Sequence, residues 1–203
     1  MLIKLLSENP AVFFAVVAAL IISISIHEFA HAFTAEKLGD STPRYMGRVT
    51  LDPRAHLDPV GTLLLVFAGF GWGKPVLFNP INLKNPKRDA ALIAFAGPFS
   101  NLALALVLSV IFHLFSLNSN IILGGFLYLV IFYNIILGIF NLLPVHPLDG
   151  FKVVSGLLPQ NLYFQWMQME RYGVIILMLL ILTRSTGVIV TPFVNILLHL
   201  FRL

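Results

Sequence analysis

The sequence predicts an all-α polytopic membrane protein, a bundle of about four to six transmembrane helices with one re-entrant or interfacial segment. Of its 203 residues, 58% are hydrophobic and 11% are charged, whereas a soluble domain is about 45–50% apolar and about 25% charged. The mean hydropathy is +0.91. Because the chain is long enough for only one compact bundle, we expect a single membrane-embedded domain over residues 1–203.

Four apolar segments reach or approach the length of about 20 residues that a membrane-spanning helix needs. They run from about Pro10 to Ala35, Ala90 to Phe115, Ile121 to Leu143 and Tyr172 to Phe201. The first is too long for a typical cleaved signal peptide, and we expect it to be retained. The fourth is interrupted near Arg184, so residues 172–203 could form one bent helix, or a short span followed by an interfacial helix.

The segment around residues 61–78 differs from these four spans. Residues 61–73 are apolar but too short to cross a bilayer, and glycines and Trp72 interrupt them before Lys74 and Pro75. Non-helical backbone at membrane depth is tolerated only where protein or a water-filled cavity covers it. We therefore expect a re-entrant or interfacial segment here.

The distribution of basic residues predicts the orientation in the membrane. Residues 36–90 hold eight of the 13 lysines and arginines, and residues 116–120 hold none. By the positive-inside rule, the first connection is cytoplasmic and the second is external. The net charge of +4 therefore reports orientation, and we expect no nucleic-acid partner.

A metal-binding pattern lies inside the first apolar segment, where residues 27–31 read His-Glu-Phe-Ala-His. Positions i and i+4 share one face of a helix, so His27 and His31 can bind one metal ion together. Burying these groups in a membrane is costly unless they are paired or functional. The chain has no cysteine, which leaves nitrogen and oxygen ligands and predicts one Zn²⁺ per chain.

A catalytic zinc usually has three protein ligands and one open position. Asp149 is the best third ligand, because Pro147 and Gly150 loosen the helix around it. Glu28 would act as general base: it takes a proton from the attacking water and passes it to the departing amine. The orientation above places this site towards the cytoplasmic side.

For each of four further polar residues, the sequence allows two interpretations. Asn101 could hold substrate or stabilise the oxyanion, or it could only link helices. Asn141 has the same two readings, and we favour the structural one. His56 could orient a ligand, although its His-Leu-Asp-Pro context is typical of a turn. His146 could support Asp149 from outside the ligand set, or face solvent in a loop.

With these residues in place, the chain resembles the site-2 protease family of intramembrane zinc metalloproteases, and in particular short prokaryotic members without a PDZ domain. The matching motifs are the HExxH motif at 27–31, Gly-Pro-Phe-Ser-Asn at 97–101, residues 52–61 and 71–75, and the run from Asn141 to Gly150. His146 departs from the family, which usually has proline there.

The resemblance implies zinc held by His27, His31 and Asp149, with Glu28 and Asn101 as catalytic residues. It implies a metalloendopeptidase in a prokaryotic cell membrane that cleaves transmembrane or membrane-associated segments of membrane proteins. Residues 69–75 could pair with an extended substrate as a strand. Two alternatives are an intramembrane zinc transporter and a catalytically silent chaperone for membrane helices. The oligomeric state is not predicted.

Overall fold

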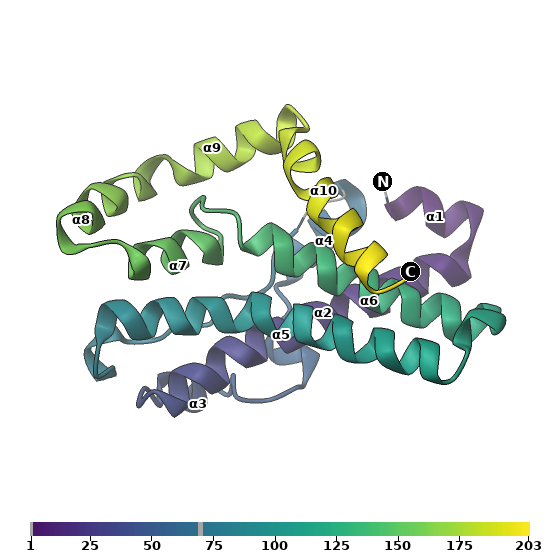
Figure 1. The fold of residues 1–203 in the computed structure, drawn as a ribbon, viewed down its shortest axis with the longest axis horizontal. Coiled ribbons are helices and arrows are strands. Elements are labelled where there is room, and N and C mark those ends of the chain that lie inside the picture. The colour runs from purple at the N-terminus through teal and green to yellow at the C-terminus, as the bar shows by residue number, and fades with distance from the viewer. Residues whose placement is uncertain (1, 69–70) are drawn as a thin grey trace.

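The computed structural model describes residues 2–68 and 71–203, and in this part of the chain the regular structure is helical (Figure 1). The α-helices are α1 (Leu2–Glu8), α2 (Pro10–Lys37), α3 (Thr42–Tyr45), α4 (Pro59–Ala68), α5 (Pro86–Leu114), α6 (Ile121–Asn141), α7 (Asp149–Leu157), α8 (Gln160–Gln168), α9 (Glu170–Leu182) and α10 (Ser185–Leu200). Short 3-10 helices are η1 (Pro53–Ala55), η2 (Pro80–Asn82) and η3 (Leu117–Ser119).

Three long helices, α2, α5 and α6, pack against one another at the centre of the molecule (Figure 1). Each is long and apolar enough to cross a membrane. Their starts follow from local chemistry: the Asn9 side chain caps α2, Asn120 caps α6, and α2 and α5 each begin with a proline. The three predicted spans in these regions are confirmed.

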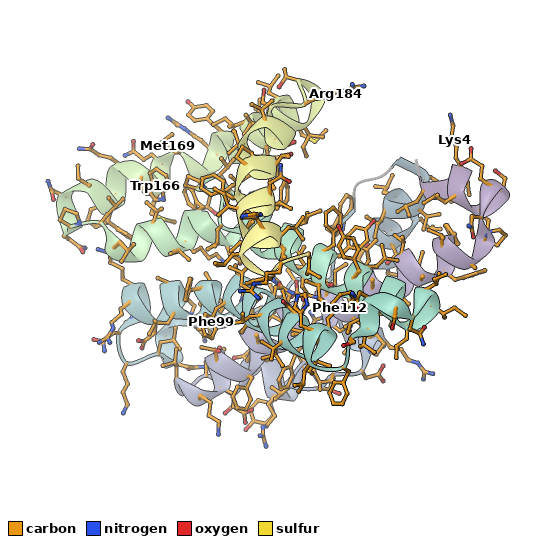
Figure 2. All side chains as sticks on the ribbon, turned by 45° about the vertical axis from the view of Figure 1, so that its right-hand side comes forward. Lys4, Phe99, Phe112, Trp166, Met169 and Arg184 are labelled. Atoms are coloured by element: carbon orange, nitrogen blue, oxygen red, sulfur yellow. The ribbon has the colours of Figure 1, made fainter. Side chains whose placement is uncertain are left out.

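The fourth apolar segment forms a broken pair of helices. α9 and α10 are bent by 78° at a break of residues 183–184, and together they count as a fourth candidate span. Figure 2 places Arg184 at the corner between them, where its φ is +59°. The described residues thus contain three candidate spans, or four if the bent pair counts as one, and four is the lower end of the expected range.

A hydrophobic core joins α10 to the central helices. Its buried side chains come from α5, α6 and the C-terminal end of the chain, and they are Ala105, Phe112, Ile131, Ile135, Ile139, Val190, Val194 and Phe201. Large apolar side chains also point outward from α5 and α9, as lipid-facing surfaces require.

The segment around residues 61–78 is short helix followed by non-helical chain. α4 covers only 10 residues, too few to span a bilayer, and residues 69–70 lie outside the described part. Gly73 then pairs with Leu57 in an antiparallel bridge, and the Lys74 amide donates to the His56 carbonyl over 2.7 Å. The chain thus folds back on itself, in agreement with the predicted re-entrant or interfacial segment.

Asp40 fixes the far end of residues 71–79, which we call the 71–79 segment. Its buried carboxylate accepts hydrogen bonds from the Asn79 amide over 2.6 Å and from Asn82 Nδ2 over 2.7 Å. Burial raises the pKa of Asp40, but hydrogen bonds from Thr42, Asn82 and Asn79 outweigh it, and the pKa lies below its ordinary value. The ionised carboxylate thus holds the segment against the end of α2.

Candidate metal centre

α2 and α7 bring together the three predicted metal ligands. His27 Nε2 lies 3.0 Å and His31 Nε2 lies 3.2 Å from Asp149 Oδ2, and the two imidazole nitrogens are 3.0 Å apart. Zinc–nitrogen bonds of about 2.0–2.1 Å imply donor atoms about 3.4 Å apart in a tetrahedral site. The three atoms are close to that spacing.

Hydrogen bonds behind the imidazoles aim them at this point. A histidine Nδ1 facing a carbonyl oxygen must donate, and His27 Nδ1 donates to Asn101 Oδ1 over 2.6 Å while His31 Nδ1 donates to the Ile93 carbonyl over 2.7 Å. With Nδ1 used in this way, Nε2 of each ring is the atom that faces Asp149 and can bind a metal ion. Asp149 Oδ2 is buried and has no hydrogen-bond partner among the described residues. A cation fits this donor set.

Two glycines make room for the ligands. A side chain at Gly97 of α5 would place its Cβ 2.4 Å from His31 Nε2 and 2.7 Å from His27 Cε1. A Cβ at Gly150 would lie 2.2 Å from the Leu142 carbonyl oxygen, where the chain turns back from α6 into α7. These close approaches let α5 pack directly on the imidazoles and bring Asp149 to them.

A buried polar network behind His27 links three helices. Asn101 Nδ2 of α5 donates to the Ser23 carbonyl over 3.0 Å and to Asn134 Oδ1 over 2.7 Å. Asn134 Nδ2 of α6 donates to Ser23 Oγ of α2 over 2.8 Å. Both N–H groups of the Asn101 amide are thus bonded to protein groups, and its contact with substrate stays a prediction. Ser23 and Asn134 were not predicted as site residues, although a polar residue inside an apolar span is a signal for such a network.

We expect Asn101→Ala to weaken zinc binding about 10–100-fold, the effect typical of losing a partner that orients a metal-bound histidine. Competition with a chromophoric chelator would measure the affinity. If Asn101 instead contacted substrate, cleavage would fall at saturating zinc while zinc affinity stayed unchanged.

Asn141 faces the site, in contrast to Asn101. It lines a cavity of about 160 Å³ together with all three metal-ligand candidates and Glu28. Its amide donates to the Leu137 carbonyl over 3.0 Å, and since an amide has two N–H groups, one remains for the cavity. The structural reading that we favoured for Asn141 accounts for only one of these donors.

Glu28 borders the same cavity and lies near a buried arginine. Its Oε2 is buried without a hydrogen bond among the described residues, and Arg48 Nη2 lies 3.8 Å from it. Arg48 donates to the Ala55 carbonyl over 2.5 Å and to the Lys74 carbonyl. Burial lowers the pKa of Arg48, and the Glu28 carboxylate offsets part of that effect. From the sequence, Arg48 was interpreted only as one of the basic residues that set the orientation in the membrane.

The two other candidate histidines, His56 and His146, lie outside the lining of the metal-centre cavity. His56 is fully buried, and its Nε2 donates to the Thr50 carbonyl over 2.7 Å, as in a stabilised turn. His146 is half-buried and lies 3.6 Å from Glu170 of α9, not against Asp149. A role for either residue in supporting the ligands stays a prediction.

Comparison with known proteins assigns the class. The family model of peptidase family M50 matches residues 15–122 and 116–182. The chain therefore belongs to this family, and the resemblance to site-2 proteases is confirmed.

Several curated sequences are similar over most of the chain. YwhC of Bacillus subtilis, provisionally named a zinc metalloprotease, is 39% identical over 88% of this chain and 85% of its own length. Rip2 of Mycobacterium tuberculosis, provisionally named in the same way, is 33% identical over 71% of this chain and 57% of its own length. The zinc metalloprotease MJ0392 of Methanocaldococcus jannaschii is 27% identical over 75% of this chain and 37% of its own length. No solved structure matches the chain.

Proposed function

We propose that the chain is an intramembrane zinc metalloendopeptidase that cleaves transmembrane or membrane-associated segments of membrane proteins. The observation that carries this proposal is the convergence of His27, His31 and Asp149 beside Glu28 on one cavity, within a bundle of apolar helices. Membership of a peptidase family and the names of the relatives support it.

The proposed chemistry assigns a task to each side chain. His27, His31 and Asp149 hold one zinc ion, which polarises the scissile carbonyl and acidifies water when bound. Glu28 takes a proton from the water oxygen that attacks the carbonyl carbon, and it returns the proton to the amine nitrogen as the C–N bond breaks. Asn141 donates its second N–H to a substrate carbonyl.

The path of the substrate follows from the cavities around the metal centre. A second cavity of about 350 Å³ shares His27, Glu28, Pro75, Asn141 and Pro147 with the first, and it extends towards Trp72 and Phe140. The 71–79 segment borders both cavities. An unwound substrate lying along this segment would present its peptide bonds to the metal centre, as a strand added to an edge does.

Location and orientation are part of the proposal. The chain would act as one integral membrane domain in a prokaryotic cell membrane, with its active site towards the cytoplasm. The basic residues of 36–90 support this orientation. The variant Asn118→Cys tests it: a thiol reagent that cannot cross the membrane should label this cysteine when it is added outside intact cells.

The test is reconstitution of the purified chain in liposomes with a fluorogenic transmembrane peptide. Cleavage should stop when a chelator removes the metal and return when zinc is added back, with one zinc per chain by elemental analysis. Cleavage that continues without bound metal would contradict the proposal. Zinc flux across the vesicles without cleavage would support the transporter alternative, although only one group of described residues is arranged to hold a metal. Peptide binding without cleavage would support the chaperone alternative.

A further inference from the structure

A third cavity adjoins the metal-centre cavity and is lined by two lysines. It measures about 340 Å³ and lies between the 71–79 segment and helices α5, α7 and α8. Most of its lining is apolar, but Lys87 and Lys152 also line it, and no carboxylate does among the described residues. We call it the two-lysine cavity.

Both lysines are held at the cavity wall by neighbouring groups that carry no negative charge. Lys87 Nζ donates to the Leu158 carbonyl and lies 5.1 Å from the centre of the Tyr163 ring. Lys152 Nζ lies 5.2 Å from the centre of the Phe78 ring. Aromatic faces attract ammonium groups and restrict them without neutralising them. Within the described ranges, neither lysine forms an ion pair.

The two-lysine cavity is continuous with the metal centre. Val76, Phe78 and Lys152 line both cavities, and Lys152 follows Asp149 by about one helical turn. The 71–79 segment runs from Pro75, which lines the metal-centre cavity but not the two-lysine cavity, to Phe78, which lines both. At about 3.3 Å per extended residue, these three steps cover about 10 Å.

We propose that the two-lysine cavity is a substrate subsite that selects an acidic side chain about three residues from the scissile bond. This inference rests on the proposed endopeptidase function. The occupant is the substrate chain itself, because the cavity continues the path along the 71–79 segment. Its apolar walls pack the stem of a glutamate or aspartate, and the two ammonium groups complement the carboxylate.

The experiment uses the full chain in phosphatidylcholine liposomes and one transmembrane peptide in several versions. After the cleaved bond is mapped by mass spectrometry, Glu, Gln or Lys is placed two, three or four residues away on either side. For each enzyme we compare kcat/KM between matched peptides. The native chain should prefer Glu over Gln up to about fivefold at one of these positions, the range for partly exposed ion pairs.

Two substitutions at the cavity and one outside it make the test specific. Lys152→Gln should bring the Glu-to-Gln ratio near one, and Lys152→Glu should make the Lys peptide the better substrate. Lys84 is exposed, lies in the basic connection of residues 36–90 and does not line the cavity. The control variant Lys84→Gln should therefore keep the native Glu-to-Gln ratio.

The outcomes separate this inference from the proposed function. Equal cleavage of all peptides, or a preference that Lys152→Glu does not reverse, would overturn the subsite and leave the endopeptidase intact. No cleavage of any peptide would overturn both. If Lys152→Gln changed only the response to added phosphatidylglycerol, the cavity would hold a lipid headgroup and the subsite would be wrong.

Discussion

Glu28→Gln is expected to lower the rate of peptide cleavage about 10²–10⁴-fold, because a glutamine cannot accept the proton of the attacking water. Zinc should stay bound, since Glu28 lies beside the ligand set and not within it. Liposome assays with a transmembrane peptide would measure the rate, and elemental analysis would measure the zinc. Loss of activity with retained metal would separate proton transfer from metal binding.

Glu36→Gln is the matched control for this change. Glu36 lies on α2 two turns after Glu28 and pairs with Arg44, whose side chain is exposed. Glu36 lines neither of the two cavities at Glu28, so this variant should cleave at the native rate. If Glu28→Gln cleaved as fast as Glu36→Gln, the general-base assignment would be wrong.

Asp149→Asn is expected to remove tight zinc binding and, with it, cleavage. The substitution keeps the size of the side chain but replaces an anionic ligand with a neutral amide, so the loss should exceed the roughly 10–100-fold effect of losing an outer partner. A ligand that binds only the folded chain stabilises it by about 2.7 kcal/mol at 100 times its Kd. The native chain should therefore show a higher Tm with added zinc, and the variant should not.

Asp52→Asn provides the control for the aspartate substitution. Asp52 is exposed in the 36–60 connection and accepts a hydrogen bond from the Arg54 amide, which an asparagine can also do. Its Tm should respond to zinc as the native Tm does. A zinc-dependent shift of native size in Asp149→Asn would exclude this residue from the ligand set.

Two kinds of site residue could be predicted from the sequence. Some follow from helical periodicity, and others are polar or charged residues whose burial in an apolar segment costs free energy. The i, i+4 spacing of His27 and His31 sets their shared face in any helix. Asp149 stood out because few carboxylates approach the membrane region. The three long spans followed from apolar length alone.

Features that depend on how distant segments pack could not be predicted. The side chain of Asn101 points to His27 instead of the cavity, because a buried amide bonds whichever partners the helix crossing supplies. Arg48 lies in the middle of the polar connection of residues 36–60 and belongs to no recognisable motif, yet it is 2% exposed. The 78° bend between α9 and α10 also depends on packing, and only its position near Arg184 was readable.

The network of Ser23, Asn101 and Asn134 affects how metal is captured. Inside a bilayer no water competes for these hydrogen bonds, so folding alone fixes the ring of His27 in its productive rotamer and tautomer. The loss of side-chain freedom is then complete before any ion arrives. Capture of the ion should require little reorganisation of the chain, and preorganised sites of this kind bind more tightly than sites that assemble around their ligand.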